Sequence, residues 1–157
     1  TKARLILGEN ALRIYLDHES IENAGLKLDE VKAAAKKDFE KYDNIAYVVD
    51  YDNVAAQSIP QPIRERIING YSRERGGDLL LVTNPGWIDA SNDANYIGTT
   101  HGLWNPDDSH IPLIFMGWNI KSGETSKPTS MTDIAPTVCS MLHIQMPNAC
   151  VGNSIFQ

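Results

Sequence analysis

The stretch GDLLLVT, residues 77–83, is a short run of apolar residues between glycine and proline turn signals, and it predicts a buried strand. IAYVVD, residues 45–50, has the same character and predicts a second buried strand. IPLIFMG, residues 111–117, predicts a third, and ALRIYLD, residues 11–17, alternates well enough to predict another. We therefore expect a sheet that is built from these four segments.

Segments with helical periodicity separate the strands. LDEVKAAAKKDFEKY, residues 28–42, predicts an amphipathic helix that has its lysines on the face opposite the apolar residues. QPIRERIINGY, residues 61–71, predicts a short helix opened by Pro62. TDIAPTVCSMLHI, residues 132–144, predicts a helix capped by Thr132. We expect the apolar residues of this last helix to lie in the core: Val138, Met141 and Leu142.

The alternation of strands and helices indicates an α/β fold. With 157 residues the chain is long enough for a real core, and we expect residues 1–157 to form a single domain. The formal net charge of −6 argues against a nucleic-acid partner, which would favour a clustered basic surface. No apolar run approaches the roughly 18–20 residues of a membrane span, so we expect no such span.

The loop 84–110 is longer than an uncommitted connection usually is, which points to a functional role. It contains the residue types that zinc accepts as ligands: Asp89, Asp93, His101, Asp107, Asp108 and His110. Aspartate and asparagine are also common in loops because they form turns, so the residues alone leave both interpretations open. A catalytic zinc site takes three protein ligands. His101 is thus a candidate ligand, whereas Asp108 and His110 are candidates for hydrogen bonding to the loop backbone.

The remaining histidines and the cysteines are weaker candidates. Asp17-His18 has the residue types of a metal-binding pair, but the glycine that a close approach to a metal would favour is absent after it. We interpret this segment as a solvated turn and His143, which lies near a helix end, as structural. Cys139 and Cys150 are too few for a zinc site or a disulfide framework, and whether they pair stays open.

Three motifs occur in order along the chain. They are Gly98-Thr99-Thr100-His101-Gly102, then Asp108-Ser109-His110-Ile111-Pro112 before a strand, and Asp133-Ile134-Ala135-Pro136-Thr137 opening a helix. With these motifs the chain resembles the C-terminal part of the alkaline-phosphatase superfamily, in particular bacterial phosphatases near the nucleotide pyrophosphatase and type I phosphodiesterase branch. The resemblance is strong over residues 61–157 and looser over residues 1–60.

The resemblance implies the fold of that superfamily, an α/β/α sandwich in which helices flank a central sheet. It also implies a hydrolase of phosphate esters that uses two zinc ions and a threonine or serine nucleophile. In the family the histidine of the first motif ligates one zinc, so the resemblance assigns His101 as a metal ligand. Asp108 and His110 would then order the loop that carries His101.

The other functional residues of the family lie N-terminal to the matched region, and this chain has none of them. They are the nucleophile, a metal-binding aspartate, an Asp-x-x-x-His pair and an Asp-His-Gly triplet. The chain also begins without methionine, so we expect a piece of a larger phosphatase that holds no catalytic residue, binds no zinc and is inactive by itself. Because related enzymes are exported, we expect the parent protein in the periplasm.

Two other interpretations stay open at this point. One is a non-catalytic domain that kept the scaffold for binding or assembly. The other is a sulfatase-type relative, since sulfatases and phosphodiesterases share the scaffold and the residues that select among their substrates are not in this stretch. The natural substrate and the oligomeric state are likewise open.

Overall fold

The computed structural model describes residues 4–90, 95–98, 100–117 and 119–156. The chain divides into two compact units, unit 1 with Thr1–Pro112 and unit 2 with Leu113–Gln157. Within the described residues, none of the helices has the length and apolar character needed to cross a membrane. A single domain over the whole chain stays a prediction.

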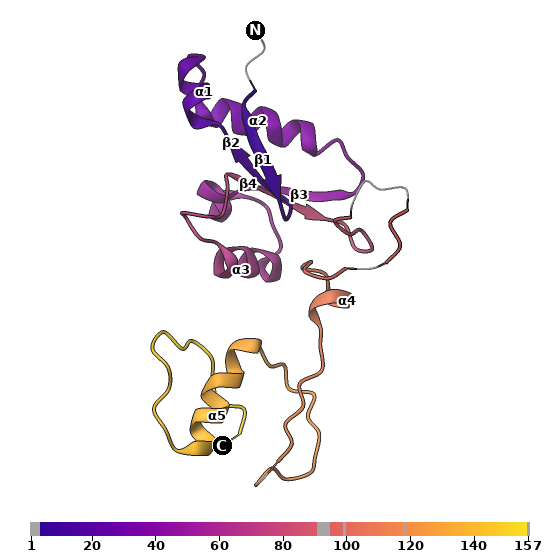
Figure 1. Ribbon diagram of the computed structural model, residues 1–157, viewed down its shortest axis with the longest axis vertical. Helices are drawn as coiled ribbons and strands as arrows, with labels where there is room; N and C mark the ends of the chain where they lie inside the picture. The colour runs from indigo at the N-terminus through magenta and orange to yellow at the C-terminus, as the bar shows by residue number, and fades with distance from the viewer. Residues whose placement is uncertain (1–3, 91–94, 99, 118, 157) are drawn as a thin grey trace. The chain divides into compact units, whose positions relative to one another are not determined.

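Unit 1 is built on a four-stranded antiparallel sheet (Figure 1). In spatial order its strands are β1 (Ile6–Asn10), β2 (Arg13–Leu16), β4 (Leu79–Thr83) and β3 (Ile45–Asp50). The strands predicted within residues 11–17, 45–50 and 77–83 are confirmed. The sequence did not indicate β1, which pairs with β2 in a hairpin at the sheet edge.

Helices cover both faces of this sheet, which confirms the α/β class (Figure 1). On one face lie α1 (His18–Asn23) and α2 (Leu28–Phe39), and on the other the 3-10 helix η1 (Tyr51–Ala56) and α3 (Gln61–Gly70). The predicted helices over residues 28–42 and 61–71 are therefore confirmed, each a little shorter at its end than expected.

The position of β4 between two helical layers explains its unbroken apolar run. Successive strand residues point to opposite faces of a sheet. Leu79 and Leu81 pack in the cluster that includes residues of α1 and α2, while Leu80 and Val82 pack in the cluster that includes residues of α3. Each of the four apolar positions of this strand is consequently in contact with a core.

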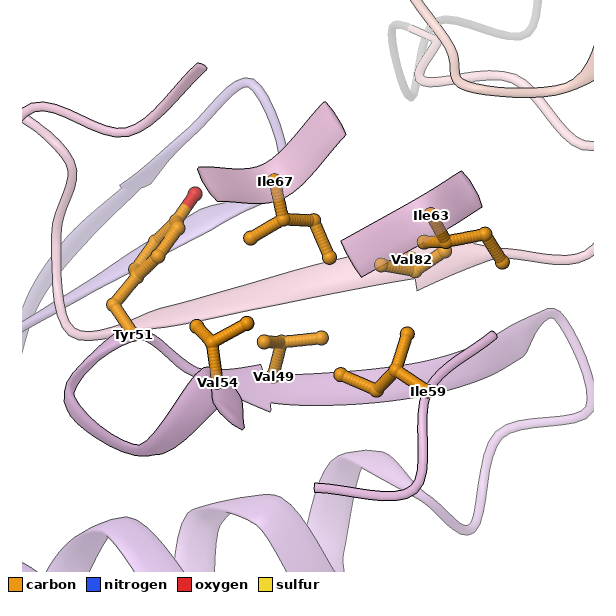
Figure 2. Close-up of a cluster of buried hydrophobic side chains, with 7 residues drawn as sticks. All are labelled: Val49, Tyr51, Val54, Ile59, Ile63, Ile67 and Val82. Carbon is orange, nitrogen blue, oxygen red and sulfur yellow. The ribbon is translucent and has the colours of Figure 1, made fainter. Parts of the chain in front are cut away.

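Seven buried side chains form the core between the sheet and α3 (Figure 2). They are Val49 and Val82 of the sheet, Tyr51 and Val54 of η1, Ile59 of the connection that follows, and Ile63 and Ile67 of α3. Ile63 and Ile67 are four residues apart and therefore lie on the same side of their helix. The ring of Tyr51 also stacks on Tyr71, with ring centroids 4.4 Å apart.

Lys32 is an exception to the expectation that the lysines of α2 lie on the face opposite its apolar residues. Its side chain is buried rather than on a solvent-exposed face. The ammonium donates a hydrogen bond of 3.0 Å to Asp50 Oδ1 and another to Asp52 Oδ2. Burial alone would lower the pKa of Lys32, but the hydrogen bonds to these two carboxylates outweigh it and raise the pKa. The helical pattern could not predict the burial of Lys32, because the two carboxylates that pair with this residue belong to β3 and η1.

Unit 2 is organised around α5 (Ile134–Leu142), which follows the 3-10 turn η2 (Met131–Asp133). The helix predicted over residues 132–144 is confirmed, with Pro136 in its first turn. The predicted cap at Thr132 is wrong. The cap lies two residues earlier, at the start of η2, where Ser130 and Asp133 form a capping box in which each side chain accepts a hydrogen bond from the other's backbone N–H.

Two further expectations for unit 2 are wrong. Residues 111–117 form no regular strand, and within the described chain no backbone hydrogen bond involves Ile111 to Met116. Val138 and Leu142 are exposed rather than in the core, and Met141 is only half-buried. Apolar sequence predicts that a residue will be covered, but the covering element must be present for burial to occur.

Candidate functional site

His101 lies in the loop between β4 and the short helix α4 (Pro106–Ser109). The side chain is exposed, and its imidazole has no hydrogen-bond partner in the part of the chain that the structure describes. Gly102, which follows, has a φ of +108°, a conformation that residues with a Cβ rarely adopt. The glycine therefore allows the backbone to bend next to an imidazole that is available for a new contact.

The carboxylate of Asp108 holds the backbone directly after His101. Asp108 Oδ2 accepts a hydrogen bond of 2.6 Å from the Gly102 N–H and one of 2.5 Å from the Leu103 N–H. Asp108 itself belongs to α4, so the bend is tied to a helical turn rather than left to solvent. A charged acceptor shared by two successive amides gives the loop a defined conformation at this point.

Trp104 and Arg66 anchor the same loop to the sheet and to α3. Trp104 Nε1 donates a hydrogen bond of 3.1 Å to the carbonyl of Thr83 at the end of β4, and its side chain packs against the core of Figure 2. Arg66 Nη1 donates to the Trp104 carbonyl at 2.5 Å and to Ser109 Oγ at 2.7 Å. Sequence reasoning missed both residues. A tryptophan within a polar loop was the one available signal.

The other candidates from loop 84–110 lie apart from this arrangement. His110 ends α4, and its backbone N–H donates to the Pro106 carbonyl at 2.9 Å, while its side chain is exposed. Asp89 and Asp107 are exposed as well, and Asp93 is outside the described residues. Over the described ranges, no three histidine, cysteine, aspartate or glutamate side chains gather closely enough to hold a metal ion.

The pair Asp17-His18 begins a helix, so its interpretation as a solvated turn is wrong. Asp17 caps α1, and its carboxylate accepts hydrogen bonds from the Ser20 N–H at 2.9 Å and the Ser20 hydroxyl at 2.7 Å. His18 Nε2 lies 2.6 Å from Asp78 Oδ1, and Asp78 Oδ2 accepts from the Leu16 N–H at 2.7 Å. These contacts tie α1 and β2 to the start of β4.

In unit 2, His143 ends a helix and neither cysteine takes part in a disulfide. His143 ends α5 in the left-handed conformation, with φ 55° and ψ 40°. Its backbone N–H donates to the Ser140 carbonyl at 3.2 Å. Cys139 is buried, Cys150 is half-buried, and both thiols are free.

A cavity of about 320 Å³ lies beside the His101 loop within unit 1. Its walls include Leu12 of the β1–β2 turn, Ile67 of α3, and Gly102 and Trp104 of the loop. Small-molecule sites commonly have volumes of about 300 Å³ or more. The lining is mainly apolar, which suits packing against a ligand or another segment better than proton transfer.

Comparisons with known proteins connect this chain to alkaline phosphatases. It is 47% identical to a calcium-transporting ATPase of Myroides odoratus, 43% to alkaline phosphatase PafA of Elizabethkingia meningoseptica and 40% to alkaline phosphatase PhoV of Synechococcus elongatus. Each alignment spans 143 residues and covers 91% of this chain. No protein-family model matches the chain.

The structural comparison gives the same relationship. The crystal structure of alkaline phosphatase PafA matches with a TM-score of 0.89 and 42% sequence identity, over 96% of this chain and 28% of that chain. The fold expected from the three motifs, that of part of an alkaline phosphatase, is thereby confirmed. The chain spans about a quarter of the length of the relatives it matches, since it covers 25–26% of each.

Proposed function

We propose that this chain, which is part of an alkaline-phosphatase superfamily protein, supplies one zinc ligand to a phosphate-ester hydrolase that is completed by a further, N-terminal part. The observation that carries the proposal is the identity of 43% and 40% to two alkaline phosphatases over nearly the whole chain. The ATPase name of the Myroides relative also describes cleavage of a phosphate bond. The three names thus share hydrolysis of a phosphoryl bond, a phosphoanhydride in the ATPase and a phosphate ester in the phosphatases.

The surroundings of His101 support its role as that ligand. A zinc ligand needs a free ring nitrogen, and within the described residues no hydrogen bond occupies the His101 imidazole. A catalytic zinc needs about three protein ligands. His101 would therefore act with ligands from outside this chain, on the exposed side of the loop.

The contacts of Asp108 support a positioning role. By holding the amides of Gly102 and Leu103, its carboxylate limits the orientations that His101 can adopt. His110 would contribute less directly, as the residue that ends the helix carrying Asp108. When bound, two zinc ions would activate the nucleophile and stabilise the charge on the leaving oxygen.

The test is turnover of p-nitrophenyl phosphate by the full-length protein with added zinc. We expect His101→Ala to lower turnover at least about 100-fold. Loss of a residue that only hydrogen-bonds to a metal ligand or its loop lowers activity less, by roughly 10–100-fold. Asp108→Asn should fall within that smaller range. His18→Ala is the matched control, because this imidazole is paired with Asp78 elsewhere in unit 1, and it should leave turnover unchanged.

A His101→Ala enzyme with wild-type turnover and wild-type zinc content would contradict the proposal. Parallel assays with bis-p-nitrophenyl phosphate and p-nitrophenyl sulfate distinguish a phosphodiesterase or a sulfatase from a phosphomonoesterase. A full-length protein that turns over none of these esters would favour a non-catalytic binding or assembly role. Export to the periplasm belongs to the same proposal, and fractionation of the source cells tests it.

A further inference from the structure

Arg66 connects α3 to both ends of the helical turn that carries Asp108. Its Nη1 donates a hydrogen bond of 2.5 Å to the Trp104 carbonyl and one of 2.7 Å to Ser109 Oγ. The Ser109 hydroxyl donates to the same Trp104 carbonyl at 3.3 Å, which closes a triangle of three hydrogen bonds. Asp108 lies between these two acceptors in the sequence, and its carboxylate holds the two amides that follow His101.

The turn α4 and the loop before it depend on such contacts. α4 has only four residues, and a single helical turn fixes many backbone angles in return for few hydrogen bonds. The loop has little packing on one side, because Gly102 and Leu103 line the cavity of about 320 Å³. Hydrogen bonds to the rest of unit 1 therefore determine where the turn and the loop lie.

The helix α3 gives Arg66 a fixed base. Ile67, its neighbour, and Ile63, one turn earlier, are buried in the core of Figure 2. The backbone of Arg66 is thus held against the sheet, while its exposed side chain reaches the loop. The hydrogen bond from Trp104 to the Thr83 carbonyl is a separate contact that does not involve α4. Loss of the Arg66 guanidinium should consequently release α4 without unfolding the core.

We infer that Arg66 is a positioning residue for the zinc ligand, which keeps α4, and through Asp108 the His101 imidazole, in the orientation that zinc requires. Arg66 would itself touch neither metal nor substrate. The inference rests on the proposed function for the identity of the ligand, and it deepens that function by naming the residue of α3 on which zinc affinity depends. A ligand that is ordered before the metal arrives loses less conformational freedom on binding, so zinc affinity is the property that should change.

Amide hydrogen exchange in the zinc-free full-length protein tests the step from Arg66 to the loop. Arg66→Met removes both hydrogen bonds and keeps an unbranched apolar side chain. We expect the Gly102 and Leu103 amides, which bond to Asp108, to exchange at least about tenfold faster in this variant, because release of α4 permits local opening.

Arg73→Met is the matched control. It removes the same charge from another exposed arginine of unit 1, whose side chain makes no hydrogen bond or ion pair among the described residues. The exchange of both amides should be the same as in wild type. Equal acceleration in Arg66→Met and Arg73→Met would overturn the inference, because the lost charge rather than the two hydrogen bonds would then be responsible.

Zinc affinity, measured by competition with a chromophoric chelator, tests the step from the loop to the ligand. Arg66→Met should bind zinc roughly 10–100-fold more weakly than wild type, as expected when a residue that supports a metal ligand is lost. Ser109→Ala removes one of the two acceptors and should weaken binding by a smaller factor. The double variant should fall short of the product of the two separate factors, since both substitutions break the same contact.

The urea midpoint of each variant separates positioning from a general loss of stability, and we expect the midpoint of Arg66→Met to stay near that of wild type. If Arg66→Met does not fold, Ser109→Ala decides by the same two readouts. Unchanged exchange of the Gly102 and Leu103 amides would overturn the inference. Faster exchange with unchanged zinc affinity would also overturn it.

His101→Ala keeps the inference distinguishable from the proposed function. If His101→Ala binds zinc and hydrolyses esters as wild type does, the proposed function fails, and the role of Arg66 toward zinc fails with it. If His101→Ala loses zinc and activity while Arg66→Met binds zinc normally, the inference fails and the proposed function stands.

Discussion

Lys32 shows how a single side chain can connect three elements. It extends from α2 to Asp50 at the end of β3 and to Asp52 in η1. Gln57 adds to the network, since its amide donates to the Asp50 carbonyl at 2.9 Å and accepts from the Asp50 N–H at 3.1 Å. Removal of a buried partner leaves the opposite charge uncompensated, which is more destabilising than never having had the pair.

We therefore predict that Lys32→Met lowers the free energy of unfolding by about 3 kcal/mol, as expected when one member of a buried ion pair is removed. Asp52→Asn should lower it by less than about 1 kcal/mol, because the Asp52 side chain is 67% exposed and water replaces its contact. Urea denaturation of the two variants and the wild type measures both values. Equal effects of the two substitutions would contradict this account of the network.

At the scale of elements, the turn between β1 and β2 is strained. Asn10 pairs with Arg13, which leaves the two-residue loop Ala11-Leu12, with φ of 49° and 62°. Two-residue hairpin loops of this kind favour glycine and asparagine, because positive φ brings Cβ close to the backbone. The Leu12 N–H donates to Glu9 Oε1 at 2.8 Å, which helps to hold the turn.

We predict that Ala11→Gly raises the free energy of unfolding by about 0.5–1 kcal/mol, because glycine removes the left-handed strain and loses only part of that gain to backbone entropy. Ala11 is exposed, so little packing is lost. Ala34→Gly, at an exposed position inside α2, should lower the same quantity by about 1 kcal/mol. Thermal or urea unfolding gives both signs, and a destabilised Ala11→Gly would show that the turn is not strained.

The motif Asp133-Ile134-Ala135-Pro136-Thr137 has a structural explanation within unit 2. Asp133 accepts hydrogen bonds of 2.8 Å from the Ser130 N–H and from the Asn153 N–H. Thr137 Oγ1 accepts from the Ile155 N–H at 3.0 Å. Gly152 lies against the Thr132 carbonyl so closely that a Cβ would collide with it. The start of α5 and the tail thus form one hydrogen-bonded assembly.

This assembly predicts an acid sensitivity. The backbone N–H groups of Asn153 and Ser130 hold the pKa of Asp133 below its usual 3.8. A carboxylate whose pKa is lower in the folded than in the unfolded state stabilises the folded state at pH values above the unfolded-state pKa. This contribution is lost as the pH falls through the folded-state pKa. Exchange protection of the Asn153 amide in wild type should therefore exceed that in Asp133→Asn at neutral pH. The difference should vanish only in acid below pH 3.8; a difference that is the same at every pH would contradict the assignment.

At the scale of the whole molecule, unit 1 presents His101, the proposed ligand, and no group of residues that could complete a metal site around it occurs among the described residues. We predict that this chain by itself, supplied with zinc, turns over p-nitrophenyl phosphate no faster than the buffer does. A two-zinc hydrolase needs ligands and a nucleophile together, and one imidazole cannot replace them. Clear catalysis that disappears in His101→Ala would contradict this expectation.

The parts that could be predicted from sequence are those whose signal is local. β3 and β4 appear as apolar runs, α2 and α3 as periodic segments, and a glycine-flanked histidine drew attention to the loop. The role of Trp104 and Arg66 as anchors could not be predicted, since each bonds a residue far away in the chain. Their geometry depends on how the sheet, α3 and the loop come together.

The sequence by itself determined which segments are apolar and periodic, and hence the α/β class, because these properties are written in consecutive residues. Only the tertiary structure decided which apolar segments are covered. IPLIFMG is as apolar as the true strands, yet within the described chain it finds no neighbouring strand to pair with. Lys32, in contrast, is buried because two carboxylates meet it. Whether a residue is buried or paired depends on which other residues lie next to it, and the assembled fold rather than the residue itself decides this.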